Sequence, residues 1–157
     1  MKALFGAGTL AAILSLTLAP PAAAQGTVEF VVDGQKVAST VHNFARFSAK
    51  DDYNLTSSMH EDKRVVKLNV RSPAAGKTLR LGSFREGNYG SYEPEYGKTG
   101  RSARITSGTI TFTRFDPVQR TFAATFEFAA KDDKGQTYEI SQGVVKDGVI
   151  GKGVVLY

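Results

Sequence analysis

Hydrophobic and polar residues alternate along most of the chain with a period of two, which is typical of half-buried β-strands. In residues 121–130, the side chains of Phe122, Ala124, Phe126 and Phe128 fall on one face and polar residues on the other. A helix would spread these phenylalanines around its circumference, whereas a strand places them together. The run therefore predicts a strand with a buried phenylalanine face.

The first hairpin is predicted by turn chemistry and by hydrophobic phase. Asp33-Gly34 is a favoured pair for a two-residue type I′ turn. Such a turn pairs Val32 with Gln35, Phe30 with Val37, and Val28 with Ser39. The face that these pairs define then carries Val28, Phe30, Val32, Val37 and Val41. Because two independent signals give one register, the hairpin is the firmest local prediction.

Further alternating runs follow at short spacing, separated by polar or Gly/Pro turns. The runs lie at residues 53–59, 66–70, 79–81, 109–115, 138–144 and 149–157, and the turns lie at 61–63, 73–76, 116–117, 132–135 and 147–148. Asp147-Gly148 repeats the type I′ signal, and a bulge near Arg114 is expected because that residue otherwise points inward. The pattern predicts an all-β, antiparallel sandwich or barrel of about eight to nine strands, and it does not separate sandwich from barrel.

Residues 1–24 have the features of a cleaved signal peptide. Lys2 precedes an uncharged run, Pro20-Pro21 interrupts it, and Ala22–Ala24 supplies small residues before the expected cut. An uncleaved anchor is the alternative, but the proline pair breaks the run before about 20 apolar residues are reached. We therefore expect export to the periplasm or the extracellular space, with residues 25–157 forming a single β domain that has no transmembrane segment.

One segment, Phe84–Gly100, departs from the alternating pattern. It contains four glycines and Pro94, and it reads as a long loop. Its candidate ligand-binding residues are Tyr89, Tyr92, Tyr96, Glu93 and Glu95. The tyrosines are expected either to form a contact surface for carbohydrate or a partner protein, or to fold back and cap the open end of the fold.

A second candidate surface is a basic stripe. Alternation places Lys67, Arg71 and Arg80 on the outward face of neighbouring runs, where they would contact anionic groups. The alternative interpretation is an ordinary solvated sheet face.

Composition limits the kinds of site that the protein can contain. The chain carries a net charge of +5, and it has no Cys and two His. Disulfide scaffolds, Cys-based zinc sites and thiol catalysis are therefore excluded. His42 and His60 are the only histidine bases for a triad, and their positions predict surface residues instead. The acidic pairs do not match a calcium-loop motif, so we expect neither a metal nor a cofactor, and no catalytic residue is assigned.

Several motifs support a resemblance. They are Ser107–Asp116, Arg120–Phe128, Ile140–Val144, Pro73–Gly82 and the opening Val31–Gln35. Together they resemble the strand-and-turn consensus of small, uncharacterised β-rich envelope proteins common in Bacteroidetes. The chain departs from that pattern in lacking a lipid-anchor Cys, in Ala123 for the usual Gly, and in Gln142 for the usual Asn. The resemblance implies an envelope β domain and carries over no catalytic residue.

Three functions remain open on the sequence. The first is a secreted, non-catalytic binding module for a carbohydrate or an envelope protein, and nucleic acid is not an expected partner. The second is a structural subunit that pairs through an edge strand such as Val149–Tyr157. The third is a polysaccharide hydrolase that uses Glu93, Glu95 or another carboxylate.

Overall fold

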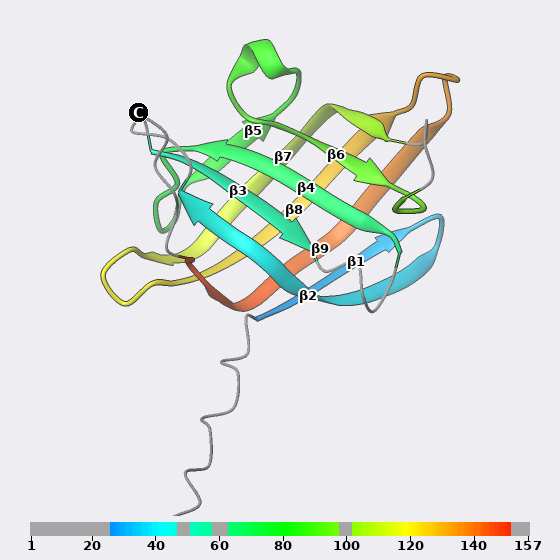
Figure 1. The fold of residues 1–157 in the computed structure, drawn as a ribbon. Coiled ribbons are helices and arrows are strands. Elements are labelled where there is room, and N and C mark those ends of the chain that lie inside the picture. The colour runs from blue at the N-terminus through cyan, green and yellow to red at the C-terminus, as the bar shows by residue number, and fades with distance from the viewer. Residues whose placement is uncertain (1–25, 47–50, 58–62, 98–101, 152–157) are drawn as a thin grey trace, which may run out of the picture.

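The computed structural model describes residues 26–46, 51–57, 63–97 and 102–151 (Figure 1). Their regular structure consists of β1 (Thr27–Val32), β2 (Gln35–Arg46), β3 (Asp52–Ser57), β4 (Val65–Arg71), β5 (Thr78–Leu81), the short 3-10 helix η1 (Phe84–Glu86), β6 (Tyr89–Glu93), β7 (Ala103–Asp116), β8 (Thr121–Lys131) and β9 (Thr137–Val149). No helix in these ranges is long and apolar enough to cross a membrane. The predicted signal peptide, residues 1–24, lies outside the described residues.

Eight strands form a closed antiparallel barrel. Around its wall the order is β7-β6-β4-β3-β2-β1-β9-β8, and β8 pairs back onto β7. The ninth strand, β5, also pairs with β7, opposite Gly108–Thr111. The predicted all-β antiparallel class is confirmed, and of its two forms the protein adopts the barrel.

The predicted first hairpin is confirmed in its turn and in its register. Asp33 and Gly34 have φ values of 51° and 72°, as a type I′ turn requires. Val32 pairs with Gln35, Phe30 with Val37, and Val28 with Ser39. Their apolar members lie in the core, together with Val41.

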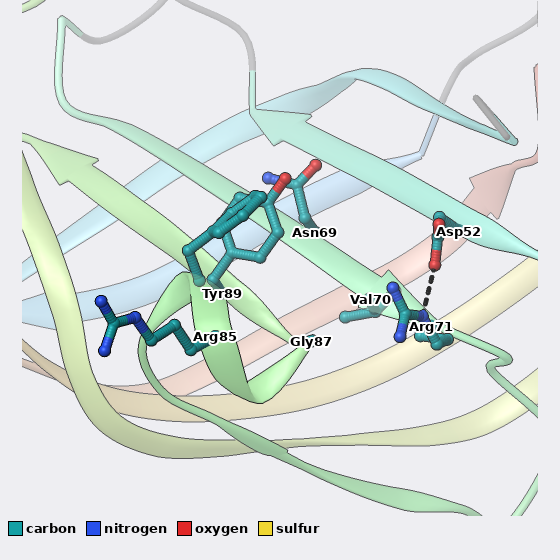
Figure 2. Close-up of a pocket in the computed structure, with 8 residues that line it drawn as sticks. Asp52, Asn69, Val70, Arg71, Arg85, Gly87 and Tyr89 are labelled. Atoms are coloured by element: carbon teal, nitrogen blue, oxygen red, sulfur yellow. Dashed lines mark hydrogen bonds and ion pairs between the residues drawn. The ribbon is translucent and has the colours of Figure 1, made fainter. Parts of the chain in front are cut away.

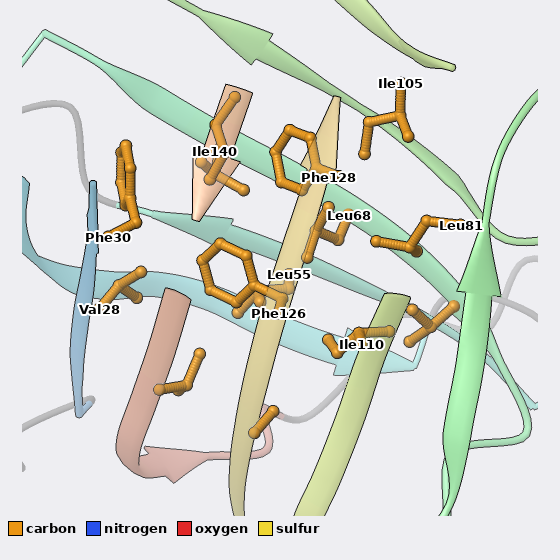
Figure 3. Packing of buried hydrophobic residues seen from close by; sticks show 14 of the residues in the cluster. Val28, Phe30, Leu55, Leu68, Leu81, Ile105, Ile110, Phe126, Phe128 and Ile140 are labelled. Atoms are coloured by element: carbon orange, nitrogen blue, oxygen red, sulfur yellow. The ribbon is translucent and has the colours of Figure 1, made fainter. Parts of the chain in front are cut away.

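The barrel interior is filled by side chains from every strand. Figure 3 shows Phe126 and Phe128 of β8 pointing inward among aliphatic residues of other strands, including Leu55, Leu68 and Ile140. Phe122, Phe126 and Phe128 are at most 3% exposed, so the predicted phenylalanine face is confirmed. At one end of the core Phe44 packs on Phe122, with ring centroids 4.0 Å apart.

Some of the bulges and turns in the structure were predicted from the sequence. The β7–β8 register shifts between Phe112 and Arg114, which confirms the predicted bulge. The turns predicted at residues 116–117 and 132–135 are confirmed as well. In each turn an aspartate, Asp116 or Asp132, accepts two backbone N–H groups through Oδ1.

The second type I′ turn is not formed, so that prediction is wrong. Asp147 has a positive φ of 49°, but Gly148 does not, and both lie within β9. The register between β8 and β9 shifts beside Asp147, so the Asp-Gly pair forms a bulge instead of a hairpin. A separate last strand from Val149 therefore does not begin there, and residues 152–157 lie outside the described part of the chain. Because β9 pairs with β1 on one side and β8 on the other, its described part offers no free edge.

The expected long loop over Phe84–Gly100 is also wrong in part. Residues 84–93 of this segment contain η1 and the whole of β6, which pairs with β4 on one side and β7 on the other. Tyr92 on β6 points into the core and is 1% exposed.

Candidate functional site

The barrel wall is interrupted where β5 and β6 meet the same edge of β7. β6 pairs with β7 only through Ser91–Arg104 and Tyr92–Ala103, and pairing with β5 begins at Gly108. Residues 105–107 of β7 therefore have no strand partner on this side, and the β7–β8 register shifts in the same stretch. The site described below lies over this interruption.

Asn88 links β4 to β5 beside this interruption. Its side-chain Oδ1 accepts the backbone N–H of Arg71 on β4 at 2.8 Å, and its Nδ2 donates to the carbonyl of Arg80 on β5 at 3.1 Å. The backbone carbonyl of Asn88 accepts the N–H of Gly82 at 2.9 Å. One asparagine thus supplies the hydrogen bonds that a strand residue between β4 and β5 would otherwise make.

The segment between Gly82 and Asn88 projects from the wall and carries η1 at its tip (Figure 1). Phe84 on η1 is 74% exposed and contacts Tyr89 edge to face, with ring centroids 4.8 Å apart. Tyr89 lies beside Asn69, its register partner on β4 (Figure 2). The two rings therefore form an aromatic pair on the outer surface of the barrel.

Strand register aligns side chains in two rows across the outer surface, and Tyr89 of the aromatic pair belongs to the first row. The first row runs Asn54–Asn69–Tyr89 across β3, β4 and β6. The second row runs Thr56–Lys67–Ser91–Arg104–Lys131 across β3, β4, β6, β7 and β8. Asn54 Nδ2 donates to Asn69 Oδ1 at 3.0 Å, and Thr56 Oγ1 donates to Asn54 Oδ1 at 2.9 Å, so the amides are held in fixed orientations.

A groove of about 430 Å³, here called the outer groove, lies between the rows and the projecting segment. Its described lining residues are Asn54, Lys67, Asn69, Gly82, Ser83, Phe84, Tyr89, Gly90, Ser91, Ser102, Arg104 and Ile105. Phe84, Tyr89 and Ile105 supply its apolar part, and amides, hydroxyls and two cations supply the polar groups. A concave surface with an apolar part and a few oriented polar groups is typical of ligand sites.

A smaller hollow of about 260 Å³ lies on the other side of the aromatic pair, since Phe84 and Tyr89 line both cavities. Arg71 Nε donates to Asp52 Oδ1 here at 2.9 Å (Figure 2). This hydrogen bond and the aspartate charge raise the pKa of Arg71 above its ordinary value. Arg71 is therefore a permanent but neutralised cation.

The structure separates the predicted tyrosines. Tyr89 lines the outer groove, whereas the buried Tyr92 packs against Phe30 and Tyr138 and has no access to a ligand outside the barrel. Tyr96 is 38% exposed and lies near the Lys67 ammonium, 5.3 Å from the ring centroid.

The two predicted carboxylates lie beyond the described lining of the groove. Glu93 accepts a hydrogen bond from Lys67 Nζ at 2.6 Å and is only 18% exposed. Glu95 follows the end of β6 and is half-buried. The pair therefore does not flank the cavity, as two carboxylates that hydrolyse a bound glycoside would.

The residues of the predicted basic stripe lie on two strands that do not pair with each other. Lys67 and Arg71 lie on β4, and Arg80 lies on β5, opposite Thr109 of β7. The Asn88 side chain links the main chains of Arg71 and Arg80. The sequence interpretation missed Phe84, Asn54, Asn69 and Arg104. Of these, only Phe84 gave a signal in the sequence, because it opens the glycine-rich segment that breaks the alternation.

His42 is not among the described lining residues of the groove. His42 is an exposed residue of β2, and His60 lies outside the described residues. In the described ranges no three His, Asp or Glu side chains gather in a way that could hold a metal ion.

Fold and site together define a closed, eight-stranded antiparallel barrel with a packed interior and a groove on its outer wall. Residues 40–148 match the family model described as a domain of unknown function, DUF6252, and the chain belongs to that family. No curated protein and no solved structure matches the chain.

Proposed function

We propose that this protein is an exported, non-catalytic binding module that holds a carbohydrate in the outer groove. The observation that carries the proposal is the contact of exposed Phe84 with half-buried Tyr89, beside a fixed row of amides. A sugar ring presents C–H groups on its faces and hydroxyls at its edge. Aromatic faces suit the former, and the amides of Asn54 and Asn69 suit the latter, because each amide both donates and accepts.

Exposure also supports a binding role for Phe84. A large apolar side chain that is 74% exposed adds little to folding, yet it is held against Tyr89. The core aromatics already fill the barrel, so the pair is not needed as a cap over an open interior.

A screen of the purified protein on an oligosaccharide array tests this function. We expect at least one glycan to bind, and Phe84→Ala and Tyr89→Ala each to lower its affinity about ten-fold through loss of stacking area. Val118→Ala is the matched control, because Val118 is an apolar residue 90% exposed in the β7–β8 turn. An array without hits, or Ala variants that bind like the parent protein, would refute the proposal.

Export and an envelope location are part of the same proposal, and they rest on the character of residues 1–24 and on the strand-and-turn resemblance. Mass spectrometry of the protein from its native cells should give an N-terminus at Gln25. A product that still begins at Met1 would contradict cleavage.

A further inference from the structure

Charge is distributed unevenly around the outer groove. The described residues that line it include two cations, Lys67 and Arg104, and no carboxylate. Two acidic side chains near the groove are already engaged: Glu93 by Lys67, and Glu86 by the hydroxyl of Ser83 at 3.2 Å.

Arg104 has an unusual neighbour. It lies directly opposite Lys131 on β8, and both side chains are exposed. Like charges directly opposite each other destabilise a sheet, so this pair is unfavourable unless an anion lies against it. Arg104 and Lys131 also line a second hollow next to the groove, together with Ser102, Asp132 and Asp133. The Asp132 carboxylate holds its own turn by accepting two backbone N–H groups.

Register gives the cations a regular spacing. Lys67 and Arg104 flank Ser91 from either side, and Lys131 continues the same row by one more strand. Neighbouring strands are about 4.8 Å apart, so Lys67 and Arg104 lie about 10 Å apart across the row. Because Glu93 neutralises Lys67, the positive charge that the row offers to a ligand lies at Arg104 and Lys131.

We infer that the ligand of the outer groove is an acidic polysaccharide, with Arg104 binding the carboxylate of a uronate residue and Lys131 interacting with the next charge along the chain. This inference rests on the proposed carbohydrate-binding function and adds the class of sugar. A guanidinium suits a carboxylate because its N–H groups form two parallel hydrogen bonds to the two oxygens. The aromatic pair binds the sugar ring, and the cations select for its charge.

Uronate oligosaccharides and their methyl esters provide matched probes, since esterification removes the charge and keeps the sugar ring. In calorimetric titrations at low salt we expect the free acids to bind about ten-fold more tightly than the esters. The preference should shrink as salt is raised, because exposed charges are screened.

Single variants show which residues give the preference for the free acid over the ester. Arg104→Gln should remove most of the preference for the free acid, and Lys131→Gln should lower acid affinity about three-fold. Arg80→Gln is the control, because Arg80 is an exposed cation on β5 outside the described lining of the groove, and it should change nothing. Circular dichroism melting curves check that each variant is folded.

The outcomes separate the two proposals. Equal affinity for acid and ester, or binding of neutral glycans alone, would overturn the acidic-ligand inference while the carbohydrate site stands. If no glycan binds, both the acidic-ligand inference and the carbohydrate-binding proposal are wrong. Binding of a single-stranded oligonucleotide as tight as that of the uronates would show unselective attraction to anions and would also overturn the inference.

Discussion

Gln142 adopts a backbone conformation that suits another residue. Its φ of 51° lies in the left-handed region, at a bulge where the register between β1 and β9 shifts. Asparagine occupies this region more readily than glutamine, because its short side chain bonds to the local backbone. The positive φ at this position therefore favours Asn over the Gln142 that the chain carries.

Gln142→Asn should therefore stabilise the protein by about 0.5 kcal/mol, through relief of backbone strain. Urea denaturation monitored by fluorescence would measure the change. Gln136→Asn is the control, since Gln136 does not have a positive φ and should gain nothing. A Gln142→Asn variant less stable than the parent would show that the glutamine side chain makes a compensating contact.

Among the elements, β6 shows best what the sequence pattern could not provide. Its five residues include Gly90 and Ser91, and Tyr92 is its single inward hydrophobic side chain, so no alternation marks it as a strand. Its place is set by pairing with β4 and β7, which are distant in sequence. The first hairpin was predictable because its turn and both strands are local.

Asp147-Gly148 illustrates the same limit. The local preference for a positive φ at Asp147 was read correctly, but the same preference serves a type I′ turn and a β-bulge equally well. Long-range pairing of β9 with β1 and β8 decides between them.

Asn88 is the residue on which the connection between β4 and β5 depends. Replacing Asn88 by Ala removes one acceptor and one donor, leaving the Arg71 N–H and the Arg80 carbonyl without their side-chain partner. We expect a loss of about 1–2 kcal/mol in the free energy of unfolding, measured by urea denaturation, and faster hydrogen exchange at the Arg71 amide.

Asn43→Ala is the matched control, because Asn43 is an exposed asparagine of β2. It should leave stability within about 0.5 kcal/mol of the parent. Unchanged exchange at Arg71 in Asn88→Ala would rule out the bridging role.

For the whole molecule, the strand pairings that close the barrel, here called seams, differ in length. β7 and β8 pair over eleven residue pairs, whereas β6 and β7 share two. Neither number is visible in the sequence, which is why alternation alone left sandwich and barrel undecided. The outer groove is a consequence of the weak seam, and its residues come together only through register among β3, β4, β6 and β7. For this reason only Tyr89 and Lys67 of its lining were among the predicted site residues.

The unequal seams predict an order of local opening. Native-state hydrogen exchange should show the amides of β7, β8 and β9 exchanging only by global unfolding, while those of β6 exchange through a lower-energy opening. Ligand in the outer groove should slow exchange in β6 selectively. Uniform protection across all strands would contradict the weak seam.

The segment from Gly82 to Asn88 leaves the wall and returns to nearly the same point, since the N–H of the first residue donates to the carbonyl of the last. Its length is therefore decoupled from the alignment of the strands on either side. The segment can therefore be lengthened or changed in sequence without repacking the interior. A foreign peptide can be inserted between the two anchor residues, Gly82 and Asn88. The barrel would then act as a display scaffold whose inserted peptide can be varied independently of the strands.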